Sequence, residues 1–389
     1  MSVSPRLKSR SAPYLSALCA LAIPVMLEQL GQILLGTVDT FFAGRIGDNA
    51  IAAVNVTNMF MNLFATVFTS LGIGIMVMIS HALGEKDEAL ANRVLRQAVL
   101  AGTGIGMGFG VLNFLCRGPF LRLAGAEGEI LALGRTYYLV VCVPCVLMCL
   151  TLILANGLKA AQNARASMRA ALASNIVNAV LDALFVQVGL GIFGLGLATT
   201  LARLLNLCLL RLYCKDVGPL KLDRSGWRPD PPLMKELLGY SGPIMCTQLS
   251  ARFAMLVHGS LVLRLGSIYY IANSITTTID EYACIPSAGF EAATATMVSN
   301  SLGAGKPKDA ARYTRTAFLS TAFCMTFIGL ILAVFAITLA GNILMRLGAG
   351  YVLAYVLQWN LMGIWTGIVL DFLFRGILLG RRFFKIYRL

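Results

Sequence analysis

Long apolar runs follow one another from one end of the chain to the other. Each is about 18 residues or longer, the length at which a helix crosses the hydrocarbon core of a bilayer. The composition agrees, because 58% of the 389 residues are hydrophobic and only 13% are charged. In lipid every backbone polar group needs a partner within the protein, and helices provide one. The sequence therefore predicts an all-α polytopic membrane protein with no large soluble domain.

The positive charge of the chain follows a membrane topology. A formal net charge of +14 could suggest nucleic-acid binding when taken alone. Most of the 32 Lys and Arg residues, however, fall in the two tails and in alternate loops between the apolar runs. Such a bias marks the cytoplasmic side. We therefore expect both termini in the cytoplasm, a multi-pass location in the cell inner (plasma) membrane, and no nucleic-acid partner.

The apolar runs predict about ten spans, divided by a polar, proline-rich linker. Six come before the linker, at 15–44, 51–83, 90–115, 131–158, 168–188 and 193–213. Four come after it, at 235–264, 268–302, 311–340 and 361–380. This gives an N-terminal six-helix lobe at 1–213, a cytoplasmic linker at 214–234 and a C-terminal lobe at 235–389.

The second half of the chain repeats the first at a constant offset of 219 residues. The matched pairs include Pro24 with Pro243, Gly84 with Gly303, and Arg93 with Arg312. Six expected spans separate the copies, so the two repeats have the same orientation in the membrane. Two parallel lobes around a central cleft are an architecture of secondary transporters.

The first span carries polar groups that membrane helices rarely contain. Glu28, Gln32 and Asp39 lie 4 and 7 residues apart, so a helix places them on one face. A carboxylate at membrane depth costs about 2.5–3.5 kcal/mol, and two in one span therefore indicate a function. Pro24 lacks the backbone N–H and weakens the helix around it. We expect a bendable helix that carries an ionisable switch.

Two other spans carry polar stripes. Asn178 and Asp182 share one face of the fifth span, while Asn58 and Asn62 belong to a stripe on the second. Three such helices can enclose a hydrated cavity. Alternatively, amides and hydroxyls only hold helices together, and for the second span both interpretations stay open. For Asp39 with Asp182 a functional role is favoured, because buried carboxylates join helices poorly without cations.

The expected spans contain more acidic than basic residues. Asp280, Glu281 and Glu291 belong to the eighth span, and Arg252 is one of three arginines within the spans. The acidic excess suits cationic cargo and coupling ions. His258 corresponds to Asp39 in the repeat and is either a scaffold residue or a second titrating group.

Other patterns in the sequence indicate no further chemistry. The ten cysteines lie mostly within apolar runs of a chain with only two histidines, which argues against a zinc site. Gly189, Gly191 and Gly194 spell GxGxxG, but between two membrane helices rather than after a strand, so no dinucleotide site is expected. No Walker A sequence is present, and no serine–histidine pairing favours an enzyme.

Several motifs resemble the multidrug and toxic compound extrusion family. They are Pro24 followed by TVDTFFAGRIG, then AIAAVN and SHALGEKD, the second-half echo LGAGKPKDA, and the run SNIVNAVLDALFVQVGLGIFGLGLATT. The resemblance implies export of organic, often cationic compounds in exchange for H⁺ or Na⁺. It also implies a cation-coupling site in the first lobe. The corresponding residues are Asp39, Asn178, Asp182 and Thr200, and Na⁺ at the first three would be the only metal.

The second lobe is shorter than this family predicts. Arg122 and Arg203 are 81 residues apart, whereas their repeat counterparts Arg346 and Arg375 are 29 apart. The difference is enough for two membrane helices. We therefore expect six plus four spans where the family has twelve, with a cleft open on one flank and weak or absent transport by the monomer.

Together these patterns predict a monomeric secondary exporter that is not an enzyme and needs no cofactor beyond its coupling ion. Its partners would be the lipid bilayer and a small organic substrate. A flippase of lipid-linked saccharides, a transport-impaired relative and a receptor-like relative are the alternatives. The expected substrate cleft or switch comprises Pro24, Glu28, Gln32, Asn58, Asn62, Arg252, His258, Asp280, Glu281 and Glu291.

Overall fold

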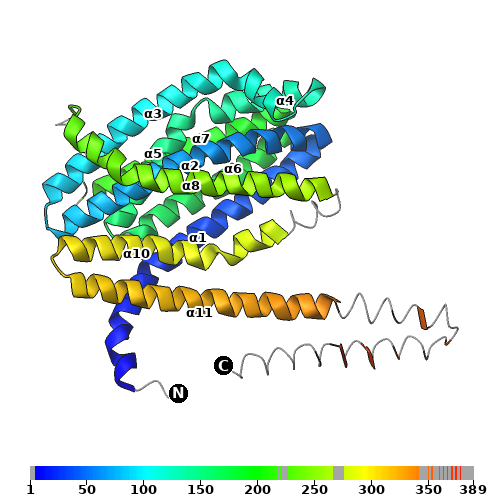
Figure 1. Ribbon diagram of the computed structural model, residues 1–389. Helices are drawn as coiled ribbons and strands as arrows, with labels where there is room; N and C mark the ends of the chain where they lie inside the picture. Colours follow the sequence, from blue (N-terminus) through cyan, green and yellow to red (C-terminus); the bar gives the residue numbers. More distant parts are fainter. Residues whose placement is uncertain are drawn as a thin grey trace. The chain divides into compact units, whose positions relative to one another are not determined.

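The computed structural model describes residues 5–216, 220, 227–265, 276–340 and isolated positions between 349 and 377. Within these residues the chain is helical and contains no strand, as the sequence predicts (Figure 1). The first seven helices are α1 (Pro5–Ile46), α2 (Asp48–Gly84), α3 (Glu88–Leu123), α4 (Gly128–Cys142), α5 (Cys145–Ala160), α6 (Ala164–Gln187) and α7 (Gly191–Asp216). They are followed by α8 (Pro231–Leu265), α10 (Ile285–Gly303) and α11 (Pro307–Ala340).

A glycine and two capping side chains determine where several helices begin or end. Gly47 alone separates α1 from α2, with a φ of 151° that residues with a Cβ rarely adopt. The side chain of Asp87 accepts a hydrogen bond of 2.8 Å from the backbone N–H of Leu90 and so caps the start of α3. Asn163 caps α6 in the same way through the N–H of Ala166, at 3.3 Å.

The chain divides into two compact units, residues 1–319 and 320–389, with the boundary inside α11. The first unit contains α1 to α10 and the first turns of α11. All side-chain contacts discussed below lie within this unit. The second unit is described only by the remainder of α11 and by isolated positions beyond it.

By length and composition, the described residues contain six helices able to cross a membrane, or seven if α4 and α5 form one span. The predicted span at 131–158 is not one straight helix, because α4 and α5 are bent by 41° at residues 143–144. Pro144 explains the break, since it has no backbone N–H to continue the helix. The expected span at 268–302 is described only from residue 276, and most of 361–380 lies outside the described residues.

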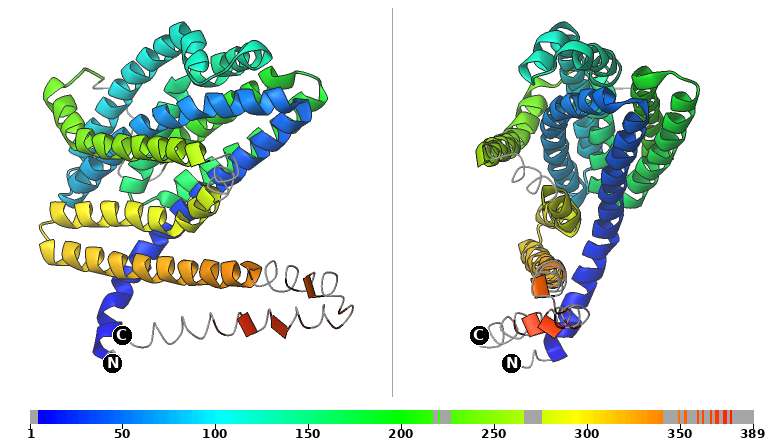
Figure 2. Two further views of the ribbon diagram at one scale, coloured as in Figure 1. Left: turned by 45° about the vertical axis from the view of Figure 1, so that its right-hand side comes forward. Right: turned by 90° about the vertical axis from the view of Figure 1, so that its right-hand side faces the viewer.

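Helix α2 forms the centre of the first unit. It packs against α3, α4, α5, α8 and α10, while α1 runs alongside α6 and α10 (Figure 2). Glycines allow some of these close approaches. An added Cβ at Gly72 would overlap the side chain of Asn156 on α5, and one at Gly74 would overlap Ser241 on α8.

The sequence repeat is also visible in the packing. At Gly84, the last residue of α2, an added Cβ would overlap the carbonyl oxygen of Asn300. At Gly303, its counterpart in α10, an added Cβ would overlap the carbonyl oxygen of His81. His81 and Asn300 are themselves separated by 219 residues. The two repeat copies therefore meet through equivalent surfaces at these helix ends.

Candidate functional site

Helices α1 and α6 lie close together at the point where their polar faces meet. An added Cβ at Gly31 of α1 would come within 2.8 Å of the Leu172 side chain and 3.2 Å of the Asn175 side chain. Glycine at position 31 therefore permits this approach. It brings the carboxylate of Asp39 to the face of α6 that carries Asn178 and Asp182.

One amide joins the two carboxylates. Nδ2 of Asn178 lies 3.2 Å from Oδ1 of Asp39 and 2.6 Å from Oδ2 of Asp182, and it donates to both. Asn178 and Asp182 are fully buried, whereas Asp39 is half-buried. Two carboxylates on one amide repel each other when both are ionised, which favours the binding of a cation between them.

Two oxygens at this site have no hydrogen-bond partner among the described residues, namely Oδ1 of Asn178 and Oδ1 of Asp182. Leaving a buried polar atom unpaired costs free energy, so these atoms are ready to accept a ligand. Carboxylate and amide oxygens suit H⁺ or a hard cation such as Na⁺. Within the described residues no cluster of three His, Cys, Asp or Glu side chains exists that could hold a transition metal.

Two charged or polar neighbours of the site escaped the sequence analysis. Arg203 of α7 and the fully buried Tyr137 of α4 both interact electrostatically with Asp39. Tyr137 sits within an apolar run, where an aromatic residue gives no functional signal. Arg203 marks only a repeat position in the sequence, and its approach to Asp39 depends on tertiary packing.

Three side chains complete the hydrogen bonding of the α4–α5 break. A helix would pair the carbonyl of Val140 with the N–H of residue 144, which is proline and has none. Oγ1 of Thr200 donates to the oxygen of Val140 instead, at 2.7 Å. Nη1 of Arg203 donates to the oxygen of Val141 at 3.0 Å, and Nδ2 of Asn113 donates to that of Cys142 at 3.2 Å. Thr200 therefore lies at the break, with its hydroxyl proton directed to the backbone.

Glu28 has partners of its own, away from Asp39. Its Oε1 lies 3.0 Å from Nζ of Lys159, and its Oε2 accepts a 2.9 Å hydrogen bond from the hydroxyl of Ser167. The carboxylate is buried, so removing either partner would leave its charge only partly compensated and would destabilise the protein. These contacts fasten α1 to the end of α5 and the start of α6. On the same helix, Pro24 is buried within continuous α1 and Gln32 is exposed.

The polar stripe of α2 faces partly outward. Asn58 is half-buried and Asn62 is exposed. Thr66 donates its hydroxyl to the backbone oxygen of Asn62 at 2.8 Å and accepts a 3.3 Å hydrogen bond from Nε of Arg252 on α8. This last bond links the two repeat copies.

The ionisable residues that the sequence predicts for the cleft in the second copy are exposed, unlike the buried Asp182 of the candidate ion site. His258, Asp280, Glu281 and Glu291 are all exposed on the surface of the first unit. No ion pair to any of them occurs among the described residues. Arg375, the repeat counterpart of Arg203, lies outside the part of the chain that the structure describes.

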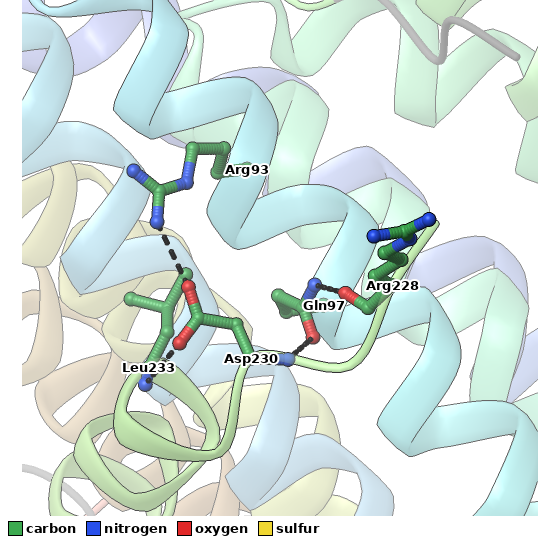
Figure 3. A network of polar contacts seen from close by, with 5 residues as sticks. All are labelled: Arg93, Gln97, Arg228, Asp230 and Leu233. Carbon is green, nitrogen blue, oxygen red and sulfur yellow. Dashed lines mark hydrogen bonds and ion pairs between the residues drawn. The ribbon is translucent and has the colours of Figure 1, made fainter. Parts of the chain in front are cut away.

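A polar network fastens the start of α8 to α3. Nη2 of Arg93 lies 2.8 Å from Oδ2 of Asp230, the residue before α8 (Figure 3). Gln97 donates to the backbone oxygen of Arg228 at 2.7 Å and accepts from the backbone N–H of Asp230 at 3.0 Å. Oδ1 of Asp230 accepts from the N–H of Leu233 at 3.4 Å, which caps α8. We call this network the α3–α8 latch.

The repeat counterpart of Arg93 makes an equivalent connection. Arg312, on α11, donates to the hydroxyl of Tyr14 on α1 at 2.9 Å. Tyr14 in turn donates to Oδ1 of Asp309 at 2.8 Å and packs edge-on against Tyr313 with ring centroids 4.9 Å apart. We call this second network the α11–α1 latch. Each latch joins the third helix of one copy to the first helix of the other.

The sequence matches a known family model. The MatE model matches residues 24–184 and 243–380. Over 426 residues the chain is 23% identical to the uncharacterized transporter YisQ of Bacillus subtilis, covering 94% of this chain and 93% of that protein. It is 22% identical to a probable multidrug resistance protein NorM of Thermotoga maritima, covering 82% and 70%.

Solved structures share the fold. One is a multidrug resistance MATE family transporter of the MOP superfamily in its outward-facing conformation, with a TM-score of 0.72 and 18% identity. That match covers 96% of this chain and 97% of the other. A MATE structure in the bent conformation has the same TM-score, with 19% identity and 96% coverage of both chains.

Proposed function

Since the chain belongs to the MatE family of membrane transporters, we propose that it is a secondary exporter of organic, often cationic compounds. Export would be driven by the entry of H⁺ or Na⁺ from outside, with both chain termini in the cytoplasm. Relatives of the chain include a multidrug export protein MepA of Staphylococcus aureus, which is 21% identical over 70% of this chain. We propose a small organic substrate and a monomeric working unit, in which the short second lobe would make transport weak.

One observation carries this proposal. The Asn178 amide holds Asp39 and Asp182 together, and two of the oxygens there have no partner within the described residues. Two carboxylates without an equal number of paired cations are costly in a membrane protein unless they bind a cation during function. Arg203 supplies one positive charge in the neighbourhood of Asp39 but forms no ion pair with it among the described residues, so the carboxylates can still take up a coupling ion.

The contacts of α1 suggest how ion binding could move it. The helix is fastened at Glu28 by Lys159 and Ser167, and it meets the ion site at Asp39. Gly36 lies between these points with nothing packed against it. Thr40 donates its hydroxyl to the carbonyl of Gly36 at 2.9 Å, a contact that often bends helices. We infer that ion binding changes the bend of this stretch and thereby the shape of the substrate cleft.

Transport in vesicles tests the proposal. The purified full chain is placed in liposomes, a pH or Na⁺ gradient is imposed, and export of a cationic dye is followed by fluorescence. The variants are Asp39→Asn and Asp182→Asn, which keep the shape of the side chain but cannot ionise. Asp48→Asn is the matched control, because Asp48 is exposed at the start of α2. We expect both site variants to lose gradient-driven flux and the control to keep it.

Two outcomes would reject the assignment. Normal flux in both site variants would remove Asp39 and Asp182 from coupling. Flux of a lipid-linked saccharide without any ion gradient, and none of cationic dyes, would replace the exporter with a flippase of the same fold.

A further inference from the structure

A groove at the outer end of the first unit differs from the ion site in both position and chemistry. It has a volume of about 750 Å³ and lies between the last turns of α3, the second half of α4 from Arg135 onward and the start of α7. Its charged lining residues are Arg117 and Arg135, and its apolar lining residues include Leu115, Leu139 and Phe193. By the charge distribution of the loops, this end of the helices faces away from the cytoplasm.

The two arginines are held in place but have no acidic partner. The guanidinium of Arg117 lies over the ring of Phe114, with 4.6 Å from Cζ to the ring centroid. That of Arg135 lies over Gly118, where an added Cβ would come within 3.1 Å of Nη2. Among the described residues neither forms an ion pair with a carboxylate. By contrast, Arg203 and Arg252 donate to protein oxygens.

Both arginines lie near the expected boundary of the membrane, where an unpaired positive charge costs free energy. Each lies within about two turns of the outer end of its helix. That position corresponds to the boundary between the hydrocarbon core and the headgroups, where long cationic side chains reach toward phosphates. An unpaired guanidinium at this depth is stabilised by a nearby anion.

The apolar walls indicate what kind of anion fits. Leu115 is 69% exposed, and Phe193 and Leu139 are 44% and 38% exposed. Only 22% of the most apolar 18-residue stretch of α3 is buried inside the protein, so most of this stretch faces its surroundings. A soluble anion would leave these side chains uncovered, whereas a lipid covers them with its acyl chains.

We propose that this groove binds one anionic phospholipid of the outer leaflet. Its phosphate lies between the guanidinium groups of Arg117 and Arg135, and its acyl chains lie along Leu115, Leu139 and Phe193. The same groove borders Val140, whose carbonyl oxygen is bonded by Thr200 at the α4–α5 break. The lipid therefore contacts the segment that carries the break, and it does so independently of the proposed transport function.

Native mass spectrometry of the purified full chain tests the site. Phosphatidylglycerol and phosphatidylcholine with identical acyl chains are titrated separately, and the bound lipids are counted. The test variant is Arg117→Gln with Arg135→Gln. The matched control for each single substitution is Arg122→Gln, which removes one charge from the last turn of α3, outside the groove. We expect one phosphatidylglycerol to be lost from the double variant, with apparent affinity lower by about tenfold.

Further variants keep the test decisive if the double glutamine variant folds poorly. Arg117→Lys with Arg135→Lys retains both charges and should retain most of the preference for phosphatidylglycerol. Equal lipid binding by wild type and both single glutamine variants would overturn the proposal. Displacement of the bound lipid by millimolar inorganic phosphate would also overturn it, because the groove would then be a site for a soluble anion. A dimer that disappears in the double variant would assign the groove to a second copy of the chain instead.

Discussion

The two copies of the repeat agree where helices meet and differ where ions could bind. Gly84 and Gly303 make equivalent close contacts, and Arg93 and Arg312 make equivalent latches. Yet Asp39 lies against Asn178, whereas its counterpart His258 is exposed and has no acidic partner among the described residues. Packing between the copies thus follows the repeat, while in the described part of the chain the paired carboxylates occur only in the first copy. An exporter with this arrangement would use one lobe for coupling and both for opening and closing.

The largest expected effect comes from removing the amide that joins the carboxylates. Asn178→Leu keeps a buried side chain of similar size but offers no donor, so Asp39 and Asp182 repel each other without relief. We expect gradient-driven flux to fall by about tenfold or more, within the usual range of coupling between sites. His258→Leu, the substitution at the other copy, should leave flux within about twofold in the same liposome assay. Equal losses in the two variants would contradict the division between the copies.

The next largest effect should be equal in the two copies. Gly84→Ala and Gly303→Ala each place a Cβ against a backbone oxygen of the opposite copy. Neither oxygen can move without shifting its helix, so each variant should destabilise the protein by about 1–3 kcal/mol. Gly104→Ala is the control, because nothing lies within 4 Å of an added Cβ there. Thermal unfolding in detergent measures all three, and a normal melting temperature for either interface variant would remove that contact from the interface.

The sequence could predict what depends on local pattern and on the repeat. Apolar runs predict the helices. The polar faces of the first and fifth spans predict that Asp39 of α1 and Asp182 of α6 lie near each other. The constant offset predicts which contacts should be equivalent, as at Gly84 and Gly303. The coupling role of the carboxylates stays a prediction that the transport assay tests.

Other features depend on partners that are far apart in the chain. Glu28 shares a face with Asp39 in the sequence pattern, but its charge is balanced by Lys159, 131 residues away. Thr200 and Arg203 reach carbonyls that are free only because Pro144 breaks the helix. The bonds of Thr200 and Arg203 do not follow from periodicity, because they depend on how α4 and α7 are placed relative to each other. This is why the break itself and its hydrogen-bond donors were missed.

The two latches should have smaller and similar effects. Arg93→Gln removes the ion pair with Asp230, and Arg312→Gln removes the bond to the Tyr14 hydroxyl. Both arginines are more than half exposed, so each contact contributes about 0.2–1 kcal/mol and weakens with salt. We expect faster hydrogen exchange at the starts of α8 and α1, respectively, by about two- to fivefold.

Asp230 separates the charge of the latch from its capping role. Asp230→Asn removes the ion pair but keeps an oxygen for the N–H of Leu233, whereas Asp230→Ala removes both. The alanine variant should therefore speed exchange at the start of α8 more than the asparagine variant. If exchange were the same in Arg93→Gln as in wild type at low salt, the Arg93–Asp230 ion pair in Figure 3 would have no part in holding α8.

The smallest expected effect concerns the pH dependence of export. His258 is the repeat counterpart of Asp39, and the sequence alone allows it to be a second titrating group. Its side chain is exposed, and neither Asp280 nor Glu281 forms an ion pair with it among the described residues. Without a charged partner, a change in the charge of this exposed side chain has little effect on the free energy of the distant ion site. His258→Gln should therefore leave the pH midpoint of dye export unchanged, while Asp39→Asn abolishes the pH response. A displaced midpoint in His258→Gln would show that the second copy also binds protons, and the contrast between the copies would then be one of degree.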